Sequence, residues 1–384
     1  GLRIGAHRTR SPAVMRISAK KLWSDGVWLT DRTVVINDGI ITDITEDLTG
    51  DILTEYLAPG LIDNHIHGGD GISVIDSDAD EICDWLVKLA ESGVCGVAAS
   101  PYGRIDEIHG MLSVLHEVKR RQDNGEAGGA LLLGAHLEGP FISPDRPGSF
   151  MPETIETPSV DSLLRLIDGY EDIVTEMTLA PEVTGNEIIR KLVRRGIKVL
   201  AGHTDCTYDQ ALQAFESGVG ATTHTFNACR PLHHREPGLI AAALTDNGIY
   251  CELICDLVHL HPGTIRLLYH CKGAGRLMVI SDGVSTTNLP DGIYDEKGVS
   301  VTVKNGESRL SDGGSLNGGG CYVSRSAKKL YDIGIPSADL PYMTAVAPAE
   351  WLGFDNSIGV GKRAFLTAFG EDFDGAFSVI GDRV

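Results

Sequence analysis

The 384-residue sequence has few of the features that mark membrane or secreted proteins. No apolar run approaches the ~20 residues that cross a bilayer, and the polar opening of the chain does not resemble a signal peptide. The eight cysteines include no Cys-x-x-Cys pair, and no Asn-x-Ser/Thr glycosylation acceptor occurs. We therefore expect reduced thiols, no membrane partner and a cytoplasmic location.

Positive charge is also scarce, since 33 Lys and Arg residues stand against 53 Asp and Glu residues and the net charge is −20. A general nucleic-acid surface needs a basic patch, so we expect no nucleic-acid partner. A pocket that is locally positive can still bind an anionic substrate. The length and the ordinary hydrophobic content of 42% suit a barrel with an appendage.

The sequence pattern changes after Ala58-Pro59-Gly60. Residues 17–57 alternate short β-rich runs with Asp-Gly turns, which predicts a small antiparallel domain. Apolar runs that predict strands then alternate with segments that predict helices. Helices are expected over 80–90, over 187–195 after an Asn186 cap, and over 208–217 after a Thr207 cap. The expected strands are 61–67, 94–100, 131–138, 174–182, 197–203, 220–225, 250–256 and 277–282.

Eight strand–helix units predict an α/β fold, the (β/α)₈ TIM barrel. We expect residues 58–345 to form this metal-dependent catalytic domain. Residues 1–57 and 346–384 are expected to form the two parts of a small β-sandwich, because the end of the chain again shows a strand-like sequence pattern. The Gly-rich stretch 311–320 is interpreted as a turn over the site, since no strand-to-helix frame supports a phosphate loop.

Imidazole and carboxylate side chains stand at or near the ends of several predicted strands. The carboxyl ends of barrel strands meet at one mouth, so we expect these side chains to converge there. Such ligands suit a divalent metal, most simply Zn²⁺, with Fe²⁺, Mn²⁺ or Co²⁺ as alternatives. The residues are His65, His67, Glu138, His203, His224 and Asp282.

Each of these positions also has a structural interpretation. His65 and His67 are two apart on a strand and share a face, so they are either a ligand pair or a hydrogen-bonded core pair. Glu138, His203 and His224 together supply three metal ligands and leave a fourth position for water. Asp282 is either a functional carboxylate or a helix N-cap.

The chemistry that this set supports is hydrolysis of an amide. A bound metal lowers the pKa of water towards ~7 and polarises a carbonyl group. Asp282 is placed to accept the water proton and pass it to the leaving nitrogen. His136, two residues before Glu138, would brace the site or polarise the substrate.

The stretch 226–238 concentrates Arg230, His233, His234 and Arg235 in an acidic protein. Such a run is either a solvated loop or, directly after His224, an anion cradle that binds phosphate. Asn227 supplies a further donor there, and His259 follows the seventh strand of the barrel.

The chain resembles the N-acetylglucosamine-6-phosphate deacetylase family of the amidohydrolase superfamily over nearly its whole length. The resemblance rests on APGLIDNHIHGG, HLEGPFISP, AGHTD, THTFNACRPLHHREPG, DLVHLHPG and ISDGV, which occur in the family's order. HLEGPF and PLHHREPG are highly specific, whereas the His-x-His pair occurs across the superfamily.

The resemblance implies specific roles and partners. Glu138, His203 and His224 would hold the main metal, His65 and His67 would offer a second site, and Asp282 would be the general acid and base. The family's phosphorylated N-acetyl amino sugar would contact Asn227, Ala228, Arg235 and His259. Because the family's arginine can come from the partner subunit, a homodimer acting in amino-sugar catabolism is expected.

Two departures from the family lie near the expected substrate mouth. Phe150 stands in RPGSF where the family often has His or Gln, and GSLNGGG replaces a Leu-Ala-Gly-Ser type block. Both concern the sugar, so N-acetylgalactosamine 6-phosphate is an alternative substrate. Two further alternatives are an amidohydrolase that acts on another amide, a cyclic amide or a base that it deaminates, and a non-catalytic barrel that serves as a scaffold.

Overall fold

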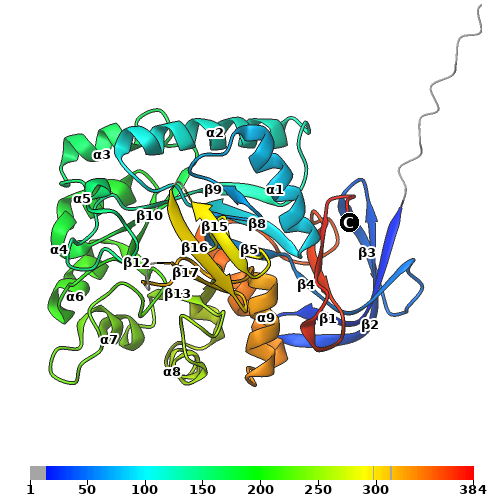
Figure 1. Cartoon of the computed structure of the whole chain (residues 1–384). Helices are drawn as coiled ribbons and strands as arrows, with labels where there is room; N and C mark the ends of the chain where they lie inside the picture. The colour runs from blue at the N-terminus through cyan, green and yellow to red at the C-terminus, as the bar shows by residue number, and fades with distance from the viewer. Residues whose placement is uncertain (1–13, 297, 312–313) are drawn as a thin grey trace, which may run out of the picture.

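A computed structural model describes residues 14–384 except 297 and 312–313. It contains a parallel sheet in the order β14-β13-β12-β11-β10-β9-β8-β5, and the gap between β14 and β5 is bridged by a hydrogen bond of 2.7 Å from His67 N–H to the Gly283 carbonyl. The predicted barrel is thereby confirmed (Figure 1). Its strands are β5 (Leu61–Ile66), β8 (Val94–Ala99), β9 (Leu131–Glu138), β10 (Val174–Leu179), β11 (Lys198–Ala201), β12 (Val219–Thr222), β13 (Tyr250–Ile254) and β14 (Leu277–Ile280).

All eight strands were expected from the sequence, but most end earlier than predicted. His203, His224 and Asp282 have φ angles of 46°, 27° and 50°. These left-handed conformations cannot continue a strand, so the chain leaves the sheet just before each residue.

Helices surround the barrel (Figure 1). In α6 the Thr207–Gln210 capping box and the left-handed Gly218 are present as predicted. Asn186 does not cap α5, however, because it is the first helical residue and Gly185 precedes it as the cap. The helices are α1 (Ala79–Glu91), α2 (Ile105–Asp123), α3 (Val160–Ile167), α4 (Pro181–Thr184), α5 (Asn186–Arg194), α6 (Tyr208–Ser217), α7 (Gly238–Thr245), α8 (Pro262–Lys272), α9 (Val323–Asp332) and α10 (Ala347–Leu352).

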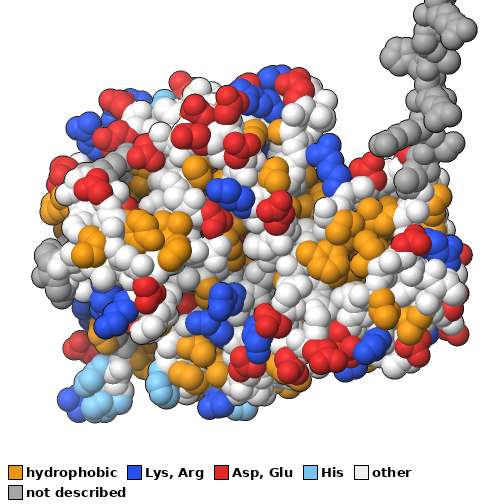
Figure 2. Space-filling model, turned by 45° about the vertical axis from the view of Figure 1, so that its right-hand side comes forward, with side chains coloured by type: hydrophobic (Ala, Val, Ile, Leu, Met, Phe, Trp, Pro, Cys, Tyr) orange, Lys and Arg blue, Asp and Glu red, His pale blue; other side chains and the backbone are white. Residues whose placement is uncertain are grey.

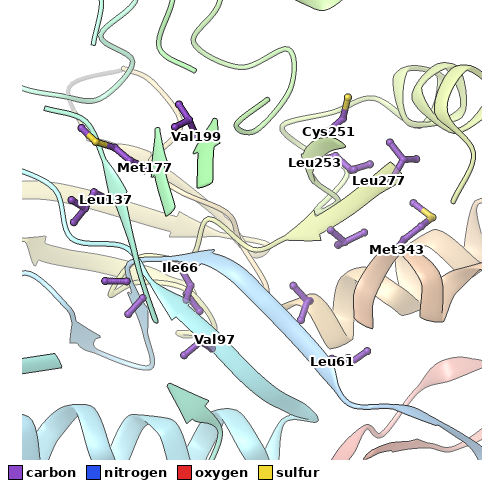
Figure 3. Packing of buried hydrophobic residues seen from close by; sticks show 14 of the residues in the cluster. Leu61, Ile66, Val97, Leu137, Met177, Val199, Cys251, Leu253, Leu277 and Met343 are labelled. Carbon is purple, nitrogen blue, oxygen red and sulfur yellow. The ribbon is translucent and has the colours of Figure 1, made fainter. Parts of the chain in front are cut away.

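Alternation along the barrel strands separates an apolar face from a polar face. Leu137, Met177 and Val199 belong to the main apolar core, which Figure 3 shows from close by. Their neighbours His136 and Glu138 are buried polar residues, and successive strand residues point to opposite faces. Near the carboxyl ends of these strands, apolar side chains therefore turn to the helices, and His136 and Glu138 lie on the inner face.

The two ends of the chain meet in a second sheet in the order β19-β18-β4-β1-β2-β3. The carboxyl-terminal strands thus complete the amino-terminal sheet as predicted, although β1 and β4 pair in parallel. A bridge between Ile40 and Arg363 curls the sheet around its own apolar core. Its strands are β1 (Met15–Ser24), β2 (Val27–Asn37), β3 (Ile40–Thr45), β4 (Ile52–Pro59), β18 (Phe365–Phe369) and β19 (Phe377–Ile380).

Three further elements pack against the barrel. A three-stranded antiparallel sheet of β15 (Gly292–Glu296), β16 (Val299–Lys304) and β17 (Glu307–Leu310) follows β14, and the sequence analysis did not predict it. On the inner side of the barrel, Trp351 of α10 packs with Leu200, Ala221 and Met278 and donates a hydrogen bond to Glu176. A small hairpin, β6 (Gly68–Gly69) and β7 (Ile72–Ser73), comes directly after β5.

The described surface carries both signs of charge. Figure 2 shows acidic side chains gathered on the upper part of one face, with Lys and Arg side chains between them and below. Among the helices of the described residues, none combines the length and the apolar composition that crossing a bilayer requires.

Candidate metal centre and substrate cavity

Glu138, His203 and His224 bring three ligand atoms together at the mouth of the barrel. The Glu138 Oε1 atom lies 3.1 Å from His203 Nε2 and 3.0 Å from His224 Nε2, and the two ring nitrogens lie 3.1 Å apart. Two ligands ~2.0 Å from a tetrahedrally coordinated zinc ion lie roughly 3.3 Å apart. This cluster therefore fits a metal ion of that size and ligand preference.

The His203 ring is oriented by a hydrogen bond behind the cluster. Its Nδ1–H donates to the Arg146 carbonyl at 3.1 Å, and its Nε2 faces Glu138 Oε1. The backbone is held as well, because the His203 carbonyl accepts from Ser143 N–H at 2.8 Å. A hydrogen bond of this kind fixes the tautomer that a metal needs.

His65 and His67 form a second ligand group that shares Glu138. His67 Nε2 lies 3.2 Å from Asp282 Oδ1 and 3.3 Å from Glu138 Oε2. His65 Nε2 lies 3.4 Å from Glu138 Oε1 and has no hydrogen-bond partner among the described residues, although it is buried. The structure thus brings all six strand-end residues together as two potential ligand groups that share Glu138.

The electrostatics of the cluster favour a bound cation. Although burial acts to raise it, the His65 charge and the imidazole hydrogen bonds hold the pKa of Glu138 well below its usual range. Burial acts to lower the pKa of His67, but its hydrogen bonds to Asp282 and Glu138 raise it to about 9. Metal ions compete with protons for such groups, since coordination requires neutral imidazole and ionised carboxylate.

His136 lies beneath this cluster and does not border the cavity described below. Its Nδ1 bonds the Asn64 carbonyl and its Nε2 bonds the Thr178 hydroxyl, both at 2.8 Å. Burial lowers the pKa of His136 to about 4, so the ring stays neutral. Its ring centre lies 4.5 Å from that of His65, so the side chain supports a candidate ligand from below.

Glu252 supports the same ligand and was missed by the sequence analysis. Its Oε2 atom accepts from His65 Nδ1–H at 3.1 Å and from His224 N–H at 3.3 Å. The available signal was a carboxylate in the middle of the apolar run YCELI, because a charge there needs a buried partner.

A cavity of about 400 Å³ opens above the candidate ligands. Of the four residues that the resemblance implies for the sugar phosphate, Asn227, Ala228 and His259 border it. Arg235 does not, because it is exposed on the loop before α7, where its Nη1 lies 2.7 Å from His234 Nε2. The lining residues include His67, Tyr102, Glu138, Phe150, His203, His224, Asn227, Ala228, His259, Asp282, Arg309, Leu316 and Asn317.

Tyr102 and Arg309 also border the cavity and were missed by the sequence analysis. Tyr102 follows β8, so its position just beyond a strand end was the available signal. Arg309 lies on β17 and pairs with Glu307. No signal pointed to Arg309, because β17 belongs to the sheet that the sequence did not predict.

The basic end of the cavity is formed by His259 and Arg309. Although burial acts to lower it, a 2.7 Å hydrogen bond from Nδ1–H to Asp256 raises the pKa of His259. The Arg309 charge acts to lower the same pKa, and both side chains line the cavity. The cavity is thus lined by carboxylates and imidazoles together with the basic side chain of Arg309.

Comparison with known proteins gives a consistent result. The model of the Amidohydrolase family matches residues 56–381. The chain is 33% identical over 362 residues to N-acetylgalactosamine-6-phosphate deacetylase of Escherichia coli O157:H7, covering 92% of this chain and 94% of that protein. It is 34% identical over 355 residues to N-acetylglucosamine-6-phosphate deacetylase of Bacillus subtilis (strain 168), covering 88% and 89%.

Solved structures show the same likeness. N-acetylglucosamine-6-phosphate deacetylase of Thermotoga maritima superposes with a TM-score of 0.85 at 29% identity, covering 96% of this chain and 99% of that chain. A mutant of the Mycobacterium smegmatis deacetylase, in complex with N-acetyl-D-glucosamine 6-phosphate, superposes with a TM-score of 0.86 at 26% identity, covering 96% and 100%.

Proposed function

Because this chain belongs to the amidohydrolase family, and within it to the N-acetylglucosamine-6-phosphate deacetylases, we propose that it hydrolyses the acetamide of N-acetylglucosamine 6-phosphate. The products are glucosamine 6-phosphate and acetate, and the bond that breaks is a linear amide C–N bond. The observation that carries the proposal is the cluster of Glu138, His203 and His224 on the floor of a cavity that Asp282 also lines.

The enzyme is metal-dependent, and Glu138, His203 and His224 would hold the main ion, with His65 and His67 available for a second. Zn²⁺ suits this donor set, as do Fe²⁺, Mn²⁺ and Co²⁺. When bound, such an ion makes water a nucleophile near neutral pH and polarises the amide carbonyl.

Asp282 moves the proton in the proposed reaction. Although burial acts to raise it, the His67 hydrogen bond and the charge of His65 keep the pKa of Asp282 below its usual value. The carboxylate is therefore ionised at neutral pH and accepts the water proton as the new C–O bond forms. It then passes this proton to the amine nitrogen as the C–N bond breaks.

His136 has a supporting role in this proposal. Both of its ring nitrogens are already hydrogen-bonded, and the ring does not reach the cavity. It braces the site, whereas polarisation of the substrate would need a free ring nitrogen at the cavity wall.

The phosphate end of the substrate is assigned to Asn227, Ala228 and His259. Arg235 is exposed and does not border the cavity of its own chain. We therefore propose that Arg235 contacts the phosphate in the site of a second copy, so that the working enzyme is a homodimer. A phosphorylated sugar substrate also favours a cytoplasmic location.

Acetate release by the metal-loaded protein tests the function. N-acetylglucosamine 6-phosphate is compared with N-acetylglucosamine, which lacks the phosphate. We expect rapid turnover of the phosphate ester and a much lower kcat/KM for the free sugar. Equal rates would contradict the phosphate assignment, and no turnover of either sugar would contradict the proposed function.

N-acetylgalactosamine 6-phosphate is the second candidate substrate. The galactosamine-type relative is 33% identical over 362 residues, and the apolar Phe150 borders the cavity. The two epimers differ only in the orientation of one hydroxyl group, so their kcat/KM values on the same preparation decide between them. A value at least tenfold higher for the galactosamine epimer would replace the first candidate.

A further inference from the structure

Tyr102 presents a free hydroxyl group to the catalytic cavity. Its ring lies edge-on to His67, with ring centres 5.2 Å apart, and edge-on to Phe150 at 5.1 Å. The side chain is half-buried and borders the cavity together with Glu138 and Asp282. Among the described residues its hydroxyl makes no hydrogen bond, so the group is available to a ligand.

Each amide side chain in the cavity wall already donates one N–H within the protein. Asn227 Nδ2–H donates to the His224 carbonyl at 3.2 Å, and Asn317 Nδ2–H donates to Glu296 at 2.7 Å. The Ser149 and Ser315 side chains are exposed. Tyr102 is a neutral donor whose ring packs directly against a candidate ligand, His67.

The charge state of Tyr102 suits a donor. Burial and the carboxylates of Glu138, Glu296 and Asp282 raise the pKa of the phenol, so its proton stays in place at neutral pH. Tyr102 lines the same cavity as Glu138 and Asp282, so it borders the space in which the proposed substrate amide would lie.

Phe150 completes a small compartment with Tyr102. Its ring centre lies 4.9 Å from that of His203, and the side chain is 7% exposed. Phe150 offers an apolar surface beside His203, and Tyr102 offers a hydrogen-bond donor beside His67. An acetyl group has matching parts, an apolar methyl group and a carbonyl oxygen.

We propose that Tyr102 is a catalytic residue that donates a hydrogen bond to the carbonyl oxygen of the scissile amide, with the acyl methyl group packed on Phe150. This inference rests on the proposed function, because it assigns the acyl end of the same substrate. Tyr102 transfers no proton in this step. Its hydrogen bond strengthens as negative charge develops on the carbonyl oxygen, while Asp282 carries the water proton to the leaving nitrogen.

Tyr102→Phe tests the proposal because it removes the hydroxyl and keeps the ring that packs on His67 and Phe150. Loss of one donor to a developing oxyanion typically costs at least about 10²-fold in kcat. We expect that loss in kcat with an unchanged metal content and thermal midpoint. The matched control is Tyr294→Phe, which removes a hydroxyl bonded to the Pro290 carbonyl on the outer hairpin and should leave kcat unchanged.

An activated substrate separates electrophilic assistance from a structural role. The carbonyl of an N-trifluoroacetyl analogue is already electron-poor and depends less on a donor. We therefore expect the Tyr102→Phe defect to be at least tenfold smaller with the trifluoroacetyl substrate than with the acetyl substrate. An equal defect with both substrates, or a loss of metal from the variant, would overturn the proposal.

A binding measurement keeps the inference separate from the sugar assignment. Acetohydroxamate carries the carbonyl oxygen and methyl group without any sugar, and its affinity is measured by titration calorimetry on the metal-loaded protein. We expect Tyr102→Phe to weaken binding about tenfold, the scale of one lost hydrogen bond, and Tyr294→Phe to leave it unchanged. Equal affinities of the wild type and Tyr102→Phe for acetohydroxamate would overturn the inference. A wild-type protein that hydrolyses no sugar phosphate would overturn the proposed function alone.

Discussion

Asp282 and Glu138 are two carboxylates in one cluster with different surroundings. Glu138 places Oε1 between two imidazoles at 3.0 and 3.1 Å and turns Oε2 to His67 at 3.3 Å. Asp282 meets His67 from the cavity side and is 17% exposed. Glu138 therefore has the position of a shared metal ligand, and Asp282 that of a group that reaches the substrate.

Asp282→Asn should separate these two roles. The amide keeps the shape of the side chain but cannot accept the water proton at neutral pH. We expect kcat to fall by at least about 10²-fold, the usual contribution of general acid–base catalysis, with metal content unchanged. Steady-state kinetics and elemental analysis of one preparation measure both quantities, and an unchanged kcat would remove Asp282 from the mechanism.

Glu138→Gln is the contrasting variant. Loss of its charge removes the ligand that both groups share, so we expect the purified protein to lose most of its metal and its activity together. Elemental analysis showing full occupancy would contradict the ligand assignment.

At the scale of elements, the loop 314–320 is held against the end of β14 by glycine. The Gly319 N–H donates to the Asp282 carbonyl at 2.8 Å. A Cβ atom on Gly319 would lie 1.9 Å from the Ser281 carbonyl oxygen, and Gly318 has a φ of +64°. Only residues without side chains allow this approach. The GSLNGGG departure therefore forms a tight backbone contact beside the proposed proton carrier.

Gly319→Ala should push this loop away from β14 and move Asp282 with it. We expect at least a tenfold loss of kcat with metal retained, measured by kinetics and elemental analysis. Gly110→Ala is the matched control, because Gly110 lies in α2 with no atom within 4 Å of the new Cβ. It should keep full activity and stabilise the protein by up to about 1 kcal/mol. Normal turnover of Gly319→Ala would show that the loop tolerates displacement.

At the scale of the whole molecule, the buried carboxylate of Glu176 links the barrel interior to helix α10 near the end of the chain. Glu176 is fully buried in the barrel, where it accepts hydrogen bonds from Asn64 and from Trp351 of α10, 175 residues further along. Burial, together with the charge of Glu252, raises the pKa of Glu176 to about 8. The folded protein therefore prefers the protonated form of this side chain.

This shift predicts how stability depends on pH. An acid whose pKa is higher in the folded protein contributes stability fully below its unfolded value and loses it as pH rises through the folded value. For Glu176 that window runs from 4.5 to about 8. We expect the thermal midpoint of the wild type to fall across this window, and the fall to be smaller in Glu176→Gln, which stays neutral. Identical slopes for the two proteins would contradict the assignment.

The sequence by itself determined the barrel and the six residues at its mouth. His65, Glu138 and His203 each stand at or near the end of an apolar run, and parallel barrel strands must bring those ends to one side. Local pattern therefore carried the information for the candidate metal cluster. The strand-like sequence pattern near the carboxyl end likewise predicted that both ends of the chain share one sheet.

Only the tertiary structure decided which other groups meet that cluster. Glu252, Tyr102 and Arg309 reach the site through pairings between segments that are distant in the sequence, as when His67 bonds Gly283 to close the barrel. The position of Arg235 outside the lining of its own cavity was equally hidden, because a loop takes its course from its contacts and not from its composition. Strand periodicity is a local property of the chain, whereas the walls of a cavity depend on how all the elements pack together.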